Sequence, residues 1–222
     1  MFESPTVASL LTASVAAYTL GALPSAYVAG RLHGVDIFKV GTRQAGATNV
    51  WRHVSRRTGL AVFFCDAGKG VLTIMVAGWM GLSGGWVMLT ALAAVLGHWN
   101  SVFTRFKGGD GVSTWAGLIF GTAPLISIPP FVVAALIRWR LGSKLAHPTY
   151  WGGLAGAMLF IGLSFAPVAS IARTEVFALT GLGGAVMAHS MAYHRRRLGR
   201  LKGGPADLNE GQGTPERAPA VE

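Results

Sequence analysis

The sequence predicts an all-α polytopic membrane protein of about seven transmembrane helices. We expect its N-terminus outside, its C-terminus inside and its motif-bearing loops in the cytoplasm. Of its 222 residues, 51% are hydrophobic and only 13% are charged, a balance that is rare in water-soluble domains of this size. Apolar stretches recur along nearly the whole chain, and basic residues gather between them. Cys65 is the only cysteine, which excludes a disulfide-rich scaffold.

Six apolar stretches come close to or exceed the roughly 20 residues that a helix needs to cross the hydrocarbon core. They cover residues 6–30, 59–82, 85–103, 112–137, 149–171 and 175–193. The first stretch follows no basic segment, and no convincing cleavage site comes after it, so we expect it to be retained rather than removed as a signal peptide.

The orientation follows from four basic clusters, which lie within residues 31–57, 105–107, 138–144 and 195–202. Basic loops stay in the cytoplasm, which requires an odd number of crossings. Helix-breaking Pro124, Pro129 and Pro130 interrupt the fourth stretch. We therefore expect two short or re-entrant helices there, packed within protein. Residues 1–202 form one membrane domain in this interpretation, and residues 203–222 form a disordered cytoplasmic tail.

The first polar segment lies between the first two stretches and reads Gly41-Thr-Arg-Gln-Ala-Gly-Ala-Thr-Asn-Val50, followed by Arg52. Small residues let backbone N–H groups converge on an anion, and an arginine can bind phosphate through two hydrogen bonds. The alternative is a tight loop with a capped helix start and ordinary cytoplasmic arginines. Composition alone leaves both interpretations open.

Charged residues also occur inside the apolar stretches. Asp66 and Lys69 are three residues apart, so on a helix they can pair. Charges within a span are costly and usually mark a site or a buried pair, although Lys69 could instead extend to the membrane surface. His98, near the end of the third stretch, is by itself more typical of a structural hydrogen-bonding group.

Two further basic segments are candidates for anion binding. In the first, Lys107 and the paired Gly108 and Gly109 precede a predicted helix start, which suits an anion. Asp110 opposes this, because a carboxylate there would cap the helix itself and repel phosphate. The second segment begins at His194, and its alternative role is an anchor to anionic lipid.

In this order, the segments resemble the bacterial acyl-phosphate:glycerol-3-phosphate acyltransferase family over nearly the whole chain. The residues that carry the resemblance are Gly21-Ala-Leu-Pro-Ser-Ala-Tyr27, Gly34-Val-Asp36, Gly46-Ala-Thr-Asn-Val50, Asp66 with Lys69-Gly70, Gly97-His98, Phe106-Lys-Gly-Gly109 with Gly111-Val112, and His194-Arg195 with Arg200-Leu201.

The resemblance implies a seven-helix enzyme of the bacterial inner membrane with a cytoplasmic active site. Such an enzyme moves a fatty acyl group from acyl phosphate to glycerol 3-phosphate and yields lysophosphatidic acid for phospholipid synthesis. It implies no cofactor, metal, acyl-CoA or nucleic acid; membrane lipid is the remaining expected partner, and a monomer is compatible with it. None of the six histidines is followed five positions later by aspartate, which disfavours the His-x4-Asp acyltransferases.

The resemblance also implies roles for individual residues. The implied catalytic residues are His194, Thr42 and Arg52. The implied phosphate-binding residues are Arg43, Thr48, Asn49, Lys107, Gly108, Gly109 and Arg197. The implied supporting residues are Asp66, Lys69 and His98.

The chain departs from the family pattern at several of these positions. Gly41-Thr-Arg-Gln44 stands where the family has Gly-Ser-Gly-Asn, Asp110 stands in place of a phosphate-binding lysine, and Arg197 stands in place of an asparagine. The family's downstream glutamate is absent near residues 204–206. Arg43 and Arg197 would restore the lost cation if their segments meet. The alternatives are a non-catalytic relative that binds phospholipid head groups or a partner membrane enzyme, and an organic-anion transporter.

Overall fold

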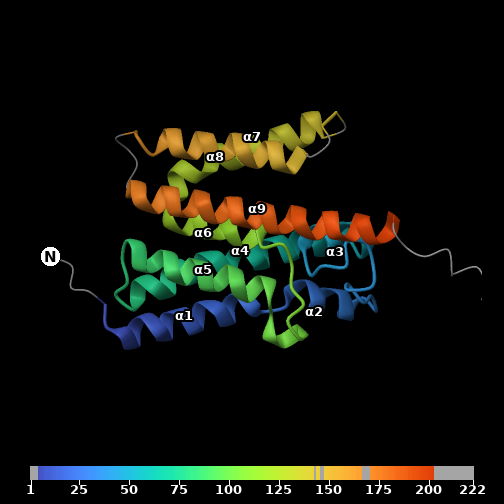
Figure 1. The fold of residues 1–222 in the computed structure, drawn as a ribbon, viewed down its shortest axis with the longest axis horizontal. Helices are drawn as coiled ribbons and strands as arrows, with labels where there is room; N and C mark the ends of the chain where they lie inside the picture. Colours follow the sequence, from blue (N-terminus) through green and yellow to red (C-terminus); the bar gives the residue numbers. More distant parts are fainter. Residues whose placement is uncertain (1–4, 143, 146–147, 167–170, 203–222) are drawn as a thin grey trace, which may run out of the picture.

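The computed structural model describes residues 5–142, 144–145, 148–166 and 171–202, without the side chains of residues 148–149, 194 and 196–202. Within these residues the fold is all helical (Figure 1). The elements are α1 (Val7–Ala22), α2 (Ser25–Leu32), α3 (Ala47–His53), α4 (Arg56–Trp79), α5 (Gly85–Trp99), the 3₁₀ turn η1 (Val102–Thr104), α6 (Val112–Thr122), α7 (Pro124–Leu141), α8 (Pro148–Leu163) and α9 (Arg173–Lys202).

Apolar helices long enough to cross a membrane dominate the described structure. There are five such segments, of which the first joins α1 and α2 over Val7–Leu32. Two shorter apolar helices, Val112–Thr122 and Tyr150–Leu163, accompany them. The all-helical membrane class is therefore confirmed. The count of seven crossings and the orientation of the termini stay predictions, and the expected tail at 203–222 lies outside the described residues.

The fourth apolar stretch is divided between two helices. α6 ends at Thr122, and Pro124 begins α7, a position where proline's missing N–H costs nothing. Pro129 and Pro130 lie inside α7 instead of ending it. The expectation of two short helices is right for the 11 residues of α6 and wrong for the 18 of α7. α9 also runs past the expected end at residue 193, through the basic cluster.

Glycines bring the helices together in close pairs. A Cβ on Gly21 would lie 1.9 Å from the Ala94 carbonyl oxygen, where α1 meets α5. A Cβ on Gly117 would lie 1.8 Å from the Ala67 carbonyl oxygen, where α6 meets α4. Glycines of α8 approach α7 in a similar way. Small residues at such crossings allow the close backbone contact on which helix association in lipid depends.

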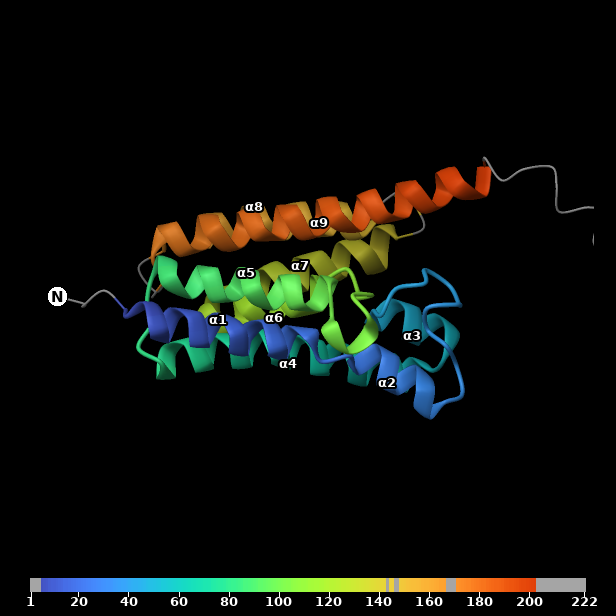
Figure 2. The ribbon, with the colours of Figure 1, turned by 60° about the horizontal axis from the view of Figure 1, so that its bottom comes forward.

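The connecting segments that carry the motifs gather at one end of the bundle. α2, α3 and the loop after α5 all lie at the end opposite the N-terminus (Figures 1 and 2). The C-terminal half of α9 extends toward the same end. Segments that are far apart in the sequence are thus placed to form one site.

Candidate active site

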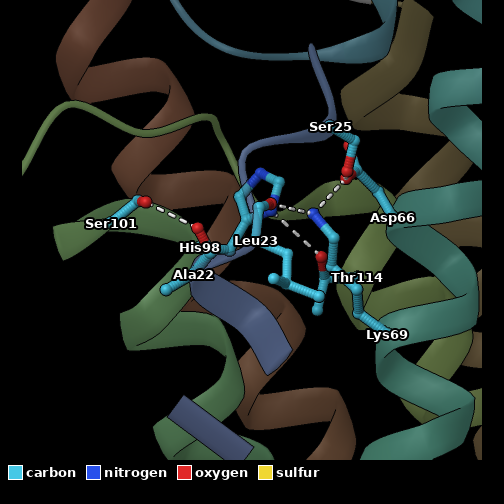
Figure 3. Close-up of polar contacts among 8 residues, drawn as sticks. All are labelled: Ala22, Leu23, Ser25, Asp66, Lys69, His98, Ser101 and Thr114. Carbon is cyan, nitrogen blue, oxygen red and sulfur yellow. Dashed lines mark hydrogen bonds and ion pairs between the residues drawn. The ribbon is translucent and has the colours of Figure 1, made fainter. Parts of the chain in front are cut away.

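A buried ion pair forms the floor of the site. Lys69 Nζ donates to Asp66 Oδ1 and to the Leu23 carbonyl oxygen, each at 2.5 Å (Figure 3). Ser25 Oγ also donates to Asp66 Oδ1, at 2.8 Å. The side chains of Lys69 and Asp66 are only 6% and 2% exposed. The predicted pairing of Asp66 with Lys69 is therefore confirmed, and the extension of Lys69 to the membrane surface is not what the structure shows.

α5 contributes polar groups beside this ion pair. His98 is buried, and its Nδ1 lies 3.2 Å from Thr114 Oγ1 of α6 (Figure 3). Ser101, just after α5, donates through Oγ to the Ala22 carbonyl oxygen at 2.5 Å. These contacts fix the ends of α1 and α5 against each other at the level of the ion pair.

Gly108 and Gly109 form a backbone wall above His98. The Gly109 amide donates to the His98 carbonyl oxygen at 3.1 Å, and the Ala45 amide donates to the Gly108 carbonyl oxygen at 3.1 Å. A Cβ on Gly108 would lie 2.0 Å from the His98 carbonyl oxygen, so only glycine fits. The Gly109 amide is thus already engaged, whereas the Gly108 amide has no protein acceptor within the described part of the chain.

Together these groups line a narrow cleft with a cavity volume of about 10 Å³, room for roughly one water molecule. Its polar lining comes from five segments of the chain: Ser25, Asp66 and Lys69, His98, Ser101 and Thr104, and Lys107 to Gly109. The cleft thus combines cationic side chains with close backbone approach, which suits an anionic ligand. Across the described residues, no group of three or more His, Cys, Asp or Glu side chains is placed to hold a metal ion.

Asn49 organises the neighbouring loop. Its Nδ2 lies 3.0 Å from the Ile37 and Gln44 carbonyl oxygens and 3.2 Å from that of Val40. Its Oδ1 accepts from the Thr42 amide at 3.1 Å. Because Asn49 is only 2% exposed and its amide is fully engaged, it positions the loop. A direct phosphate contact from Asn49 would require breaking these bonds.

The other residues predicted in this segment lie outside the cleft lining, on the neighbouring loop and α3, here called the rim. Thr48 and Arg52 are exposed on α3, and Thr42 is half-buried in the loop. The Arg52 guanidinium has no hydrogen-bond or ion-pair partner among the described residues. None of the three is in the cleft lining. The segment nevertheless reaches the cleft through Ala45, which contacts both glycines of the wall.

α9 joins the same loop through Tyr193. Tyr193 Oη donates to the Arg43 carbonyl oxygen at 3.2 Å. Arg43 itself is exposed and has a φ of 57°, an uncommon left-handed conformation for a residue other than glycine. His194 and Arg197 lie on the α9 backbone, but their side chains fall outside the described part of the structure.

Asp110 caps α6. Its Oδ1 accepts from the amide of Val112, the first residue of that helix, at 3.2 Å. Its carbonyl oxygen accepts from Trp99 Nε1 at 2.8 Å. The carboxylate therefore occupies the helix start, where the family pattern has a lysine.

Sequence reasoning gave no role to Ser25, Ser101 or Thr104, all of which line the cleft. Ser25 lies within the Gly21–Tyr27 motif, so the motif pointed to this segment. The hydrogen bond from Ser25 to Asp66 could not be inferred from the sequence. Ser101 precedes a short 3₁₀ turn and Thr104 ends it, and hydropathy does not detect such a turn.

The fold and the site together define a helical membrane protein with a basic, glycine-walled cleft at one end. The sequence profile described as glycerol-3-phosphate acyltransferase matches residues 11–204. The chain belongs to the glycerol-3-phosphate acyltransferase family.

Individual relatives bear out this membership. A glycerol-3-phosphate acyltransferase of Synechococcus sp. is 33% identical over 201 residues, which cover 90% of this chain and 93% of that one. The match with its namesake from Geotalea daltonii is 41% identical but covers only 57% of this chain and 66% of the relative. The crystal structure of PlsY (YgiH), an integral membrane glycerol 3-phosphate acyltransferase in its glycerol 3-phosphate form, superposes with a TM-score of 0.69 at 30% identity, covering 87% of this chain and 92% of that one.

Proposed function

We propose that this membrane acyltransferase moves a fatty acyl group from acyl phosphate to glycerol 3-phosphate and yields lysophosphatidic acid. The site lies on the cytoplasmic side of the bacterial inner membrane. The observation that carries the proposal is the convergence of Lys107 and the Gly108–Gly109 wall on one cleft, beside the buried Lys69–Asp66 pair, in a chain of this family. Solved forms of the neighbour PlsY hold glycerol 3-phosphate and lysophosphatidic acid.

Residues of both the cleft and its rim bind the two phosphorylated substrates. Lys107 Nζ and the Gly108 amide bind phosphate at the cleft, since neither group has a protein acceptor among the described residues. Arg52, Thr42 and Thr48 extend the phosphate site along the rim, with Asn49 holding their loop in place. The buried Lys69 and Asp66, with His98, keep the floor polar without offering a free charge.

Acyl transfer from acyl phosphate needs no further activation of the donor by the protein. Acyl phosphate is already activated, so attack by the glycerol hydroxyl requires alignment and stabilisation of the charge that develops on the carbonyl and phosphate oxygens. Exposed cations and backbone N–H groups supply that stabilisation. We assign His194 to orientation of the acceptor, by analogy with the family, and Tyr193 beside it ties α9 to the phosphate loop.

Turnover by the purified protein in detergent tests the proposal. Supplied with acyl phosphate and glycerol 3-phosphate, the protein should produce lysophosphatidic acid and inorganic phosphate, measured by mass spectrometry of the lipid. Arg52→Ala is the matched low-activity control. Wild-type turnover no higher than that of Arg52→Ala would reject the proposal.

The Asp110 cap favours a second candidate, a non-catalytic relative that binds phosphorylated lipid. Its carboxylate adds negative charge beside Gly109, where phosphate must approach. Arg43 and Arg197 compensate in the enzyme hypothesis, and a double Arg43→Ala, Arg197→Ala variant should then lose phosphate-substrate affinity. Binding of phosphorylated lipid without turnover would instead favour the second candidate.

A further inference from the structure

Beside the cleft lies a second and larger depression, here called the basic groove. Its cavity volume is about 430 Å³, and its walls include Tyr27, Arg31, Phe38, Lys39, Arg105 and Lys107. The groove shares Thr104 and Lys107 with the proposed catalytic cleft. We propose that the basic groove is a separate binding site for the phosphate of an anionic membrane lipid that is neither substrate nor product.

The charge of the groove is strongly positive and mostly unneutralised. Asp36 is the carboxylate in its wall, and it pairs with Lys39 at 3.7 Å. Arg31, Arg105 and Lys107 have no carboxylate partner among the described residues. Three cations that share a concave surface favour a phosphate group, because they can bind it together.

Aromatic rings position two of these cations, Arg31 and Lys107. Tyr27 and Phe38 stack with ring centroids 5.8 Å apart. The Arg31 guanidinium carbon lies 5.2 Å from the Tyr27 ring centroid, and Lys107 Nζ lies 6.0 Å from that of Phe38. Cations over ring faces are attracted and positioned by them, so part of the ordering cost of binding is already met.

The turn that presents Arg105 and Lys107 is backbone-strained. Arg105 and Phe106 have φ values of 54° and 60°, an uncommon left-handed conformation for residues other than glycine. The Phe106 amide bonds to the Ser101 carbonyl oxygen at 2.8 Å, and Thr104 Oγ1 donates to the Lys107 carbonyl oxygen. These bonds maintain a conformation that places both cations in the groove wall.

Exposed apolar side chains around the groove identify the ligand as a lipid. Leu32 is 80% exposed at the end of α2, and Phe103 and Phe106 are 52% and 67% exposed. α2 continues the first apolar span, which ends at Leu32. A polar groove beside exposed apolar side chains at the end of a span lies at head-group depth, where cations attract anionic lipid.

Lipid binding by the whole protein in a non-ionic detergent tests the proposal. Native mass spectrometry would count adducts of phosphatidylglycerol, with phosphatidylcholine and inorganic phosphate as parallel probes. We expect phosphatidylglycerol to bind better than phosphatidylcholine. Arg31→Gln with Arg105→Gln should weaken its binding about thirtyfold, since each basic residue near a lipid surface contributes on the order of 1 kcal/mol.

Two controls isolate the groove. Arg140→Gln removes an exposed cation that also lies over an aromatic ring, 4.7 Å from the Trp139 centroid, but outside the groove. It should leave binding unchanged. Arg31→Lys with Arg105→Lys keeps the charge and should retain most binding. This result would show that the Gln double variant loses binding because it loses charge and not because it misfolds.

The possible outcomes separate the ligand sources. Equal binding by wild type and the Gln double variant, or equal binding of the two lipids, would overturn the proposal. Inorganic phosphate that displaces phosphatidylglycerol at similar concentration would also overturn it, by identifying a free-phosphate site. Because phosphatidylglycerol is neither donor nor acceptor, failure of acyl transfer would leave this result intact, and the reverse also holds.

Discussion

The floor and the rim of the cleft both carry charge, but the charges at the floor are buried and paired, whereas those at the rim are exposed and unpaired among the described residues. At the floor, Asp66 and Lys69 are buried, and hydrogen bonds engage both groups. At the rim, Arg52 is exposed and has no ion-pair partner in the described part of the chain, and the same is true of Lys107 in the cleft lining. Charge at the floor therefore maintains structure, whereas charge at the rim is available for a ligand.

Lys69→Met should have the largest effect, and it should be on stability. It leaves the Asp66 carboxylate buried opposite an apolar side chain, and breaking a buried pair in this way costs about 3–5 kcal/mol. Denaturant unfolding in detergent measures the loss. Adding Asp66→Asn removes the uncompensated charge and should restore part of the stability. A double variant no more stable than Lys69→Met would contradict the role given to the floor.

Arg52→Ala should show the opposite behaviour at the rim. We expect kcat/KM for glycerol 3-phosphate to fall about 10- to 100-fold, as for loss of hydrogen bonds to a charged group, with unfolding almost unchanged. Arg57→Ala is the matched control, because it removes a nearby exposed arginine on α4 to which no phosphate role is assigned. Equal losses of kcat/KM in the two variants would show that the effect of Arg52→Ala comes only from the change in net charge.

Gly117→Ala tests the packing beneath the floor. The new Cβ would meet the Ala67 carbonyl oxygen at 1.8 Å, so α4 and α6 must separate, at a cost of about 1–3 kcal/mol. Gly68→Ala is the control on α4, since nothing lies within 4 Å of its Cβ position. This change should stabilise the helix by roughly 0.5–1 kcal/mol. Thermal unfolding shifts of the same sign would contradict this account.

The floor was more predictable from sequence than the rim. An i, i+3 pair of opposite charges inside an apolar stretch has few ways to be satisfied, so spacing indicated that Asp66 and Lys69 can pair, with extension of Lys69 to the membrane surface as the alternative. Hydropathy likewise located most helices, and Pro124 indicated where α6 and α7 divide. In both cases the avoidance of unsatisfied polar groups in lipid restricts the chain to a few structures.

The rim depends on contacts that no sequence pattern encodes. Asn49 reads as a phosphate ligand, yet it bonds to three carbonyl oxygens of its own loop. The seven-residue α3 is too short for periodicity to reveal it. Ser25 acquires its role from Asp66, which is 41 residues away. Long-range hydrogen bonds between loops decide these positions, so only the folded structure shows them.

Asp110→Asn should have the smallest effect and bears directly on the rim. Asparagine caps helices about as well as aspartate, so the bond to the Val112 amide can persist, and only about 0.3–1 kcal/mol of helix-dipole stabilisation is lost. Removal of the negative charge beside Gly109 should lower KM for glycerol 3-phosphate about two- to fivefold, because exposed charges interact weakly in water. The difference in KM should shrink at high salt, where screening weakens the interaction.

Asp36→Asn makes the same change in net charge beside Lys39 and should leave KM unaltered. An unchanged KM in Asp110→Asn at low salt would mean that the carboxylate does not face the phosphate site, and the case for a compensating Arg43 and Arg197 would fall with it.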